Sequence, residues 1–222
     1  MTPDEILKEL YDQTMVGNAP AVLELTRAGL AAGMSPDVLL YESLIPSLEE
    51  VGARFERGDF FVPEMLIAGK AMAGALELLR PLLAETGAET IGTFVMGTVK
   101  GDVHDIGKNL VNIMLEGAGF HVVDLGVQVA PERFVEAIEE HKPDIVGFSA
   151  FLTTTMPMFK ANINALQKAG LRERVIVMVG GAPVTQEYAD AVGADGYAAD
   201  ASAAVKRAKD LILQRRKVLA GA

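Results

Sequence analysis

The chain has 222 residues, half of them hydrophobic and 23% charged, which is the balance of a globular protein with ample material for a core. Its formal net charge is −10, and nucleic-acid binding needs a basic surface that so acidic a chain does not offer. The absence of cysteine excludes disulfides, thiolate metal sites and iron–sulfur clusters. The start is acidic and amphipathic, unlike a secretory signal, and no apolar stretch is long enough to span a membrane. We therefore expect a soluble, cytoplasmic protein with neither a nucleic-acid nor a membrane partner.

The first half of the chain, residues 1–88, is predicted to be an all-α four-helix bundle. It holds 6 basic and 14 acidic side chains, so it carries most of the negative charge. Its apolar residues advance in steps of three or four, as a helix buried on one face requires. Turn residues divide this half into about four helices with short connections, which favour an antiparallel arrangement; these turns are 17–20, 33–36 and 58–63.

Two residues predict local detail in this bundle. Ser35 precedes Pro36 and Asp37, the order typical of an N-cap, a first-turn proline and an acid that stabilises the helix dipole. Pro46 lies inside the third helical pattern and is expected to kink that helix.

The second half, residues 89–222, follows a predicted linker around Glu85–Glu89 and changes its pattern. Short runs rich in valine, isoleucine and phenylalanine alternate with helical stretches, as in βαβ units whose strands are buried on both faces. Five such units predict a doubly wound (flavodoxin/Rossmann-like) α/β domain with a five-stranded parallel sheet, in which ligands bind beyond the carboxyl ends of the strands. The expected strands lie within 90–99, 120–127, 144–150, 175–181 and 196–200, and the expected helices near 108–117, 131–141, 155–169, 185–192 and 201–216.

The loop after the first expected strand, residues 97–109, carries the clearest candidate for chemistry. It reads GTVKGDVHDIGKN, which matches neither the dinucleotide-binding nor the P-loop pattern. His104 can present a ring nitrogen to a ligand, while Asp102 can accept the other ring N–H and fix the tautomer. Gly107 allows a bulky group to approach the backbone. The alternative is that Asp102, His104 and Asp105 only cap the next helix.

Two other strand ends favour the ligand-binding interpretation. The third expected strand ends in a segment rich in hydroxyl side chains, which includes Ser149, Thr153 and Thr155. The fourth ends in Gly180 and Gly181, a stretch of backbone without side chains. Together the three segments predict one crevice with a ligating histidine, hydroxyl donors and a narrow slot.

This combination resembles the cobalamin-binding domain of corrinoid proteins, whose pattern is D-x-H-x-x-G, then S-x-L, then G-G. Here 41 residues separate Gly107 from Ser149, and 28 separate Phe151 from Gly180, as the pattern requires. Phe151 stands where the pattern has leucine. The first half of the chain is similar to the helical cap that precedes this domain in methionine synthase and in corrinoid subunits of methyltransferase systems.

The resemblance implies a cobalamin cofactor, present as methylcobalamin in the loaded state. His104 would be the lower axial ligand of cobalt in place of the cofactor's own base, and Asp102 would hold the far ring nitrogen. Asp102 would also relay a proton when cobalt changes its oxidation state, and Thr155 would be a third, hydroxyl member of that relay. Ser149 and Thr153 would contact the displaced nucleotide tail. The residues implied to bind the cofactor are Gly101, Asp102, Val103, His104, Asp105, Ile106, Gly107, Ser149, Phe151, Thr153, Thr155, Gly180 and Gly181.

The function implied by the resemblance is that of a methyl carrier with no catalytic residue of its own. It would work between a substrate-specific methyltransferase and a second methyltransferase that uses tetrahydrofolate or coenzyme M, with a reductive activase as a further partner. The methyl donor stays open among methanol, methylamines, betaines, thiols and aryl methyl ethers. Two other classes stay open: a cobalamin-dependent sensor or regulator, and a subunit of an adenosylcobalamin mutase.

The segment 58–68 of the first half also belongs to the resemblance. Phe60, Phe61 and Met65 are candidates to cover the methyl-bearing face of the corrin. Ordinary packing inside the helical bundle is an equally good interpretation of these three residues.

Overall fold

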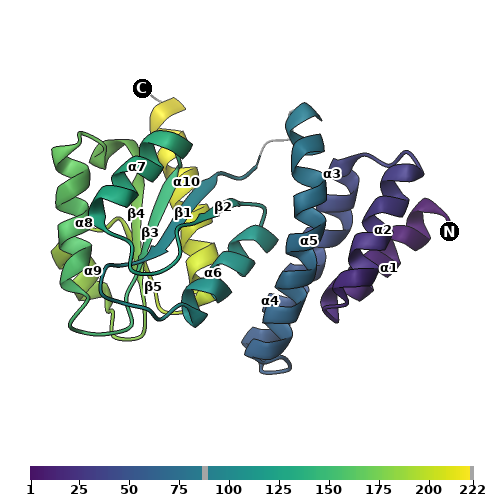
Figure 1. Cartoon of the computed structure of the whole chain (residues 1–222), viewed down its shortest axis with the longest axis horizontal. Helices are drawn as coiled ribbons and strands as arrows, with labels where there is room; N and C mark the ends of the chain where they lie inside the picture. Colours follow the sequence, from purple (N-terminus) through teal and green to yellow (C-terminus); the bar gives the residue numbers. More distant parts are fainter. Residues whose placement is uncertain (87–89, 221–222) are drawn as a thin grey trace. The chain divides into compact units, whose positions relative to one another are not determined.

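The computed structural model describes residues 1–86 and 90–220 of the chain. It divides the chain into two compact units, Met1–Glu89 with Glu116–Gly119, and Thr90–Leu115 with Phe120–Ala222. The first unit is helical and the second contains the sheet (Figure 1).

The first unit consists of helices joined by short turns. They are α1 (Pro3–Met15), α2 (Ala19–Ala31), α3 (Pro36–Leu39), α4 (Ile45–Arg57) and α5 (Val62–Thr86), with a π-helical turn, Leu40–Leu44, between α3 and α4. Because α3, the π turn and α4 follow each other without a break, the unit has four helical segments, as the turn residues predicted. Helix α2 packs against both α1 and α5.

The N-cap expected at Ser35 is present. The Ser35 hydroxyl accepts a hydrogen bond of 3.3 Å from the backbone N–H of Val38, and Pro36 occupies the first turn of α3. The irregularity of this helical segment lies directly before Pro46, where the N–H of Ile45 donates to the carbonyl of Leu40, five residues back. Since proline has no N–H, it is tolerated in the first turn of α4, and the widened turn accommodates the change.

Helix α5 is longer than the sequence pattern suggested. It continues through Pro81 and ends at Thr86, so the first two residues of the linker predicted at Glu85–Glu89 are helical. The other three residues of that linker, 87–89, lie outside the described part of the chain.

The second unit is built on a five-stranded sheet in which every neighbouring pair is parallel. The strand order is β2-β1-β3-β4-β5, the flavodoxin-like order, which confirms the predicted fold class. The strands are β1 (Thr93–Thr98), β2 (His121–Asp124), β3 (Ile145–Ser149), β4 (Ile176–Gly180) and β5 (Gly196–Ala198).

Helices connect consecutive strands and cover both faces of this sheet. They are α6 (Ile106–Gly117), α7 (Pro131–His141), α8 (Pro157–Lys168), α9 (Gln186–Val192) and α10 (Ala201–Ala220), with a short 3₁₀ turn, Arg172–Arg174, before β4. Helices α7, α8 and α9 lie on one face, and α6 and α10 lie on the other (Figure 1).

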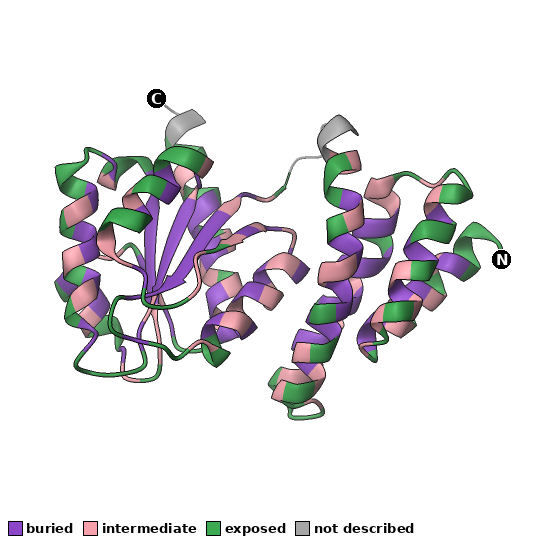
Figure 2. Ribbon diagram, viewed as in Figure 1, coloured by how far each residue is buried: buried purple, intermediate pink, exposed green. Residues whose placement is uncertain are grey.

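The core of the second unit lies between the sheet and the layer of α7, α8 and α9. Phe134, Phe148 and Phe159 are almost completely buried there and pack on the valines of the strands. The three central strands, β1, β3 and β4, are buried along most of their length (Figure 2), as their continuous apolar runs predicted. A rigid sheet of this kind holds the loops at its carboxyl edge in fixed positions.

None of the helices in the described ranges is long and apolar enough to cross a membrane.

Candidate functional site

The candidate site lies at the carboxyl edge of the sheet, where β1 and β3 are neighbours. The strand order reverses at this point, because the chain leaves β1 toward one side of the sheet and β3 toward the other. The loop between β1 and α6 carries the D-x-H-x-x-G motif, and the loop between β3 and α8 carries the hydroxyl-rich segment. The topology therefore brings together two motifs that are some fifty residues apart in the sequence, as the sequence analysis expected.

Asp102 is the centre of this site. Its side chain is completely buried, and its carboxylate accepts five hydrogen bonds. Oδ1 accepts from the backbone N–H and from Nδ1 of His104, at 3.1 and 2.8 Å. Oδ2 accepts from the backbone N–H groups of Phe151 and Leu152, at 2.8 and 3.2 Å, and from Oγ1 of Thr155 at 2.7 Å. A buried carboxylate so fully paired is stable as an anion.

The pKa of Asp102 reflects this balance. Burial alone raises the pKa of the carboxyl, but the hydrogen bonds from Thr155, from His104 and from the Phe151 backbone together hold the pKa well below its ordinary value. Asp102 is therefore ionised and can only accept hydrogen bonds, so Nδ1 of His104 must carry the proton. In the neutral imidazole this leaves the lone pair on Nε2, the form that binds a metal.

His104 presents that second nitrogen from a partly open position. Its side chain is 44% exposed, and among the described residues nothing hydrogen-bonds to Nε2. The imidazole stacks on the ring of Phe151, with centroids 4.4 Å apart and an interplanar angle of 25°. Nε2 is thus available to a ligand while the rest of the ring is held by the protein.

Two residues that the sequence analysis missed support this loop. The buried hydroxyl of Thr98, the last residue of β1, donates to the carbonyl of His104 at 3.0 Å. The backbone N–H of Gln128 donates to the carbonyl of Asp102 at 3.0 Å, and Gln128 has a positive φ of 56°. A hydroxyl residue at the end of the first strand was a readable signal for Thr98, whereas nothing in the local sequence points to Gln128.

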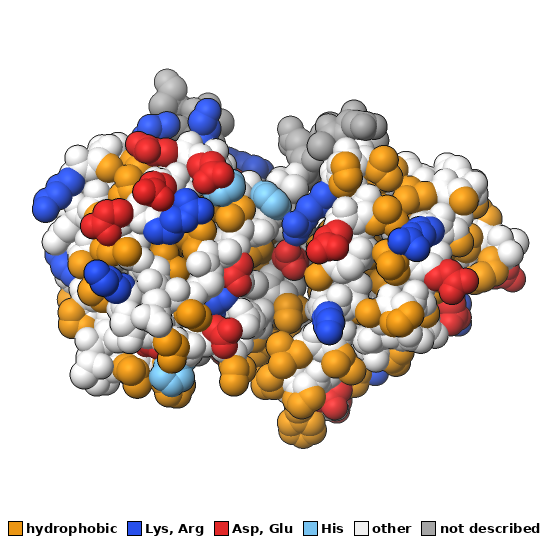
Figure 3. Space-filling view, in the orientation of Figure 1, with side chains coloured by type: hydrophobic (Ala, Val, Ile, Leu, Met, Phe, Trp, Pro, Cys, Tyr) orange, Lys and Arg blue, Asp and Glu red, His pale blue; other side chains and the backbone are white. Residues whose placement is uncertain are grey.

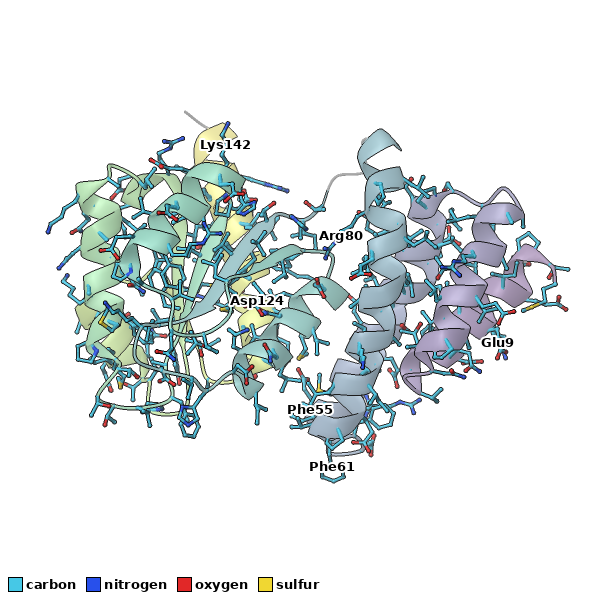
Figure 4. The ribbon with its side chains drawn as sticks, viewed as in Figure 1. Glu9, Phe55, Phe61, Arg80, Asp124 and Lys142 are labelled. Carbon is cyan, nitrogen blue, oxygen red and sulfur yellow. The ribbon has the colours of Figure 1, made fainter. Side chains whose placement is uncertain are left out.

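The sequence analysis also missed Lys108, which lies in the first turn of α6 and contacts the end of β2. This lysine is buried, and its Nζ lies 2.6 Å from Oδ2 of Asp124 and 2.6 Å from Oδ1 of Asn109. Asp124, at the end of β2 (Figure 4), also accepts from the N–H of Gly126 through Oδ1, at 2.9 Å. The ion pair ties the start of α6 to the loop that follows β2.

The alternative of simple helix capping applies to only one of the three motif residues. Asp105 directly precedes α6, its carbonyl accepts from the N–H of Asn109, and its carboxylate accepts from the Asn109 amide. The carboxylate of Asp102 instead accepts hydrogen bonds from His104 and from the distant β3–α8 loop. The pairing of Asp102 with His104 is therefore not a by-product of capping.

The other motif residues fall at the expected strand ends, with different degrees of contact. Ser149 ends β3 and is half-buried, Thr153 is exposed, and among the described residues neither hydroxyl has a hydrogen-bond partner. Gly180 ends β4, and Gly181 follows with a φ of +129°. A Cβ on Gly181 would lie only 1.9 Å from the carbonyl oxygen of Ala150, so the neighbouring backbone already requires glycine at this position. Gly101 turns the β1–α6 loop with a φ of +85°.

The surface beside His104 is apolar and open. Val103 and Ile106 are 58% and 67% exposed, and Phe151 is 51% exposed, which is unusual for residues of this type. A Cβ on Gly107, in the first turn of α6, would meet nothing within 4 Å. Hydrophobic side chains gather along the lower rim of the second unit in the view of Figure 3, where the carboxyl ends of the strands lie. This rim suits a broad, largely apolar ligand.

The three bundle residues that were candidates to cover the corrin differ in their exposure and contacts. Met65 is 1% exposed and belongs to the core of the helical unit, so for this residue ordinary packing is the correct interpretation. The ring of Phe60 lies under the guanidinium of Arg54, 5.3 Å from its centroid. Phe61 precedes α5 and projects away from the bundle (Figure 4), with 66% of its surface exposed.

Side-chain clusters that could hold a metal by themselves are absent from the described residues, where no three His, Asp or Glu side chains come together. A single available imidazole nitrogen fits a metal that arrives already bound in a macrocycle and needs one axial ligand from the protein.

Comparison with known proteins identifies the family of this fold and site. Two B12 binding domain families match the chain, one over residues 92–206 and the other over residues 6–80. Dimethylamine corrinoid protein 1 of Methanosarcina acetivorans is 43% identical over 213 residues, which are 96% of this chain and all of that protein.

Solved structures of similar chains point to the same family. The crystal structure of the methanol:cobalamin methyltransferase complex MtaBC from Methanosarcina barkeri contains a chain that is 31% identical, with a TM-score of 0.84 over 95% of this chain and 80% of that chain. The monomethylamine corrinoid protein of Methanosarcina barkeri is 36% identical, with a TM-score of 0.53 over 95% of this chain and all of that chain. The chain therefore belongs to the corrinoid proteins of the B12-binding family, and its cofactor is a corrinoid.

Proposed function

We propose that this protein is a methyl carrier that serves a methylamine methyltransferase and holds its corrinoid with His104 as the lower axial ligand. The observation that carries the proposal is the Asp102–His104 pair, in which Nδ1 is committed to a buried carboxylate and Nε2 remains available. When bound, the corrinoid supplies a nucleophilic cobalt centre that takes up and releases a methyl group.

The residues of the chain would hold and tune this cofactor. Nε2 of His104 would bind the lower face of the metal, and Asp102 would keep the Nδ1 proton shared and the imidazole basic. Thr155, which donates to the same carboxylate at 2.7 Å, would be the third member of the proton relay that the resemblance implies. The Thr155 hydroxyl also lies 2.8 Å from the carbonyl of Leu152, so its single proton is shared between two acceptors.

The surrounding loops would bind the rest of the ligand. Val103 and Ile106 would contact the corrin from the β1–α6 loop, where the space beside Gly107 is open. The unpartnered hydroxyls of Ser149 and Thr153 would donate to the displaced nucleotide tail. The remaining residues of the proposed site are Gly101, Asp105, Phe151, Gly180 and Gly181.

We assign residues 89–222 as the cobalamin-binding domain and residues 1–88 as a helical cap for the methyl-bearing face. Phe61 is the bundle residue best suited to that role, because its ring is exposed while Met65 is buried. Partners would be a substrate-specific methyltransferase, a second methyltransferase that uses tetrahydrofolate or coenzyme M, and a reductive activase. The full-length similarity to methylamine corrinoid proteins favours this reading over a sensor or a mutase subunit.

Electron paramagnetic resonance of the protein loaded with Co(II) corrinoid tests the axial ligand. In uniformly ¹⁵N-labelled protein with unlabelled cofactor, coupling to one ¹⁵N nucleus should turn the superhyperfine triplet into a doublet. His104→Gln should lose that doublet. A triplet that persists in the labelled protein would show that the cofactor's own base still binds cobalt, which contradicts the assignment.

The methyl donor is tested by offering the reduced protein to methyltransferases of known specificity. We expect a methylamine-specific enzyme with its substrate to convert the bound corrinoid to the methylated form, which absorbance follows directly. A methanol-specific enzyme should react much more slowly, since the identity is 43% to the dimethylamine protein and 31% to the methanol protein. Methylation by the methanol enzyme alone would contradict the proposal.

A further inference from the structure

Phe151 touches both members of the Asp102–His104 pair. Its backbone N–H donates to Oδ2 of Asp102 at 2.8 Å, while its ring stacks on the imidazole of His104 at a centroid distance of 4.4 Å. The residue is nevertheless 51% exposed, so Phe151 is not held there by burial in the core. One residue therefore contacts the carboxylate through its backbone and the imidazole through its side chain.

We propose that Phe151 is a positioning residue that fixes the plane of the His104 imidazole and so strengthens its bond to cobalt. The inference rests on the proposed role of His104 as the axial ligand. An imidazole turns about two side-chain bonds, and the hydrogen bond from Nδ1 to Asp102 fixes the position of only one ring atom. The parallel contact with the Phe151 ring restrains the remaining tilt, so less freedom is lost when Nε2 binds the metal.

The departure of this sequence from the corrinoid pattern thus acquires a physical meaning. The pattern has leucine at this position, and a leucine side chain has no aromatic face on which an imidazole can stack. Phe151→Leu therefore removes the stack while it keeps an apolar side chain and the backbone N–H. Phe151→Tyr keeps the ring and is the conservative variant.

A measurement on the protein without cofactor tests the stack by itself. The ring current of Phe151 should shift the carbon-bound ring protons of His104 upfield in the proton NMR spectrum. The chain has only three histidines, so His104→Gln identifies these signals. Phe151→Leu should remove the upfield shift, and Phe151→Tyr should keep it. If the His104 signals kept their upfield positions in Phe151→Leu, the stacking contact would be contradicted.

A measurement on the loaded protein tests the positioning role. An aromatic contact of this kind should change the affinity of His104 for Co(II) about fivefold. Because four-coordinate Co(I) does not hold the histidine, weaker ligation of Co(II) makes reduction easier. The Co(II)/Co(I) midpoint potential of Phe151→Leu should therefore lie about 40 mV above that of the wild type, at 59 mV per tenfold change.

Two variants make this result specific. Phe151→Tyr should restore the wild-type potential, because it restores the ring. Leu152→Ala shortens the neighbouring exposed side chain, keeps the backbone N–H that also bonds to Asp102, and should leave the potential unchanged.

The possible failures of the two proposals differ. An unchanged potential in Phe151→Leu, in a protein whose wild-type spectrum shows the ¹⁵N doublet, overturns the positioning role alone. A wild-type spectrum without that doublet overturns the axial ligand, and with it the role of Phe151 on cobalt.

Discussion

Most buried hydroxyls of the helical unit are satisfied within their own helical segment, whereas the buried carboxylate of Asp102 in the sheet unit is satisfied largely by residues far away in the sequence. In the helical unit, the buried hydroxyls of Thr14, Thr26 and Ser47 each donate to a carbonyl three or four residues back in the same helical segment. The buried hydroxyl of Ser43 differs, because it donates to the carbonyl of Leu7 in α1. In the sheet unit, the buried carboxylate of Asp102 draws three of its hydrogen bonds from residues 49 to 53 positions away. The first arrangement needs only a helix, whereas the second needs the complete sheet.

This difference indicates which of the two units contains the candidate functional site. A hydroxyl that bonds to its own helix adds little to the stability of the fold and holds nothing else in place. A buried carboxylate with five donors is expensive to desolvate, and it keeps one imidazole in one tautomer. The sheet unit therefore contains a polar network whose loss should affect both folding and ligand binding. Four predictions test this contrast.

The largest effect is expected where Gly181, after β4, lies against Ala150, at the start of the β3–α8 loop that carries the donors to Asp102. Gly181→Ala would place a Cβ 1.9 Å from the carbonyl oxygen of Ala150 at a φ that alanine rarely adopts. We expect a loss of about 4 kcal/mol in the free energy of unfolding, measured by urea denaturation, from strain and overpacking together. Gly180→Ala is the matched control, because its Cβ would lie 3.4 Å from the nearest atom. It should lose about 1 kcal/mol or less. Equal losses in the two variants would contradict the close approach.

Replacement of the central carboxylate should have the next largest effect. Asp102→Asn removes the charge and should reduce the free energy of unfolding at pH 7 by about 3 kcal/mol, because charge-assisted hydrogen bonds are lost.

The same substitution predicts a dependence on pH. The folded pKa of Asp102 is lowered, so its contribution is fully present above the ordinary carboxyl pKa of about 4 and is lost as the pH falls through the lower folded value. The difference in unfolding free energy between the wild type and Asp102→Asn should therefore shrink from pH 7 to pH 3. A difference that stayed constant over this range would show that Asp102 is not held as an anion by its neighbours.

The smallest effects come from one substitution made in both units. Thr155→Val should lower the free energy of unfolding by about 2 kcal/mol, because Asp102 loses a hydroxyl donor while valine keeps the shape of the side chain. Thr26→Val, in the helical unit, should change the free energy of unfolding by about 0.5 kcal/mol or less, because only a bond to its own helix is removed. Urea denaturation of both variants measures the two losses in the free energy of unfolding. Equal losses would contradict the difference between the two units.

The ion pair behind the site follows the same logic. Lys108 and Asp124 meet at 2.6 Å with the lysine buried, whereas Lys8 and Asp12 in the helical unit meet at 3.4 Å on an exposed surface. In the sequence, each pair is simply a lysine and an aspartate of opposite charge. Only the first connects two elements of the sheet unit, the first turn of α6 and the end of β2.

The sequence by itself determined the fold class and the motif. Apolar steps of three or four residues predicted the helical segments, and continuous apolar runs predicted the parallel sheet, because burial on one face or on both imposes these patterns on any chain. Their position directly after apolar runs likewise placed His104, Ser149 and Gly180 at the carboxyl ends of the first, third and fourth strands.

The tertiary structure decided what each of these residues touches. Local sequence could not show that the backbone of Ala150 requires glycine at position 181, that Gln128 supports Asp102, or that Phe151 stacks on His104. It also could not separate Met65, which is buried in the bundle, from the exposed Phe61. These contacts join residues that are far apart in the chain, or depend on which side of a helix is covered. They exist only once the sheet and the bundle have formed.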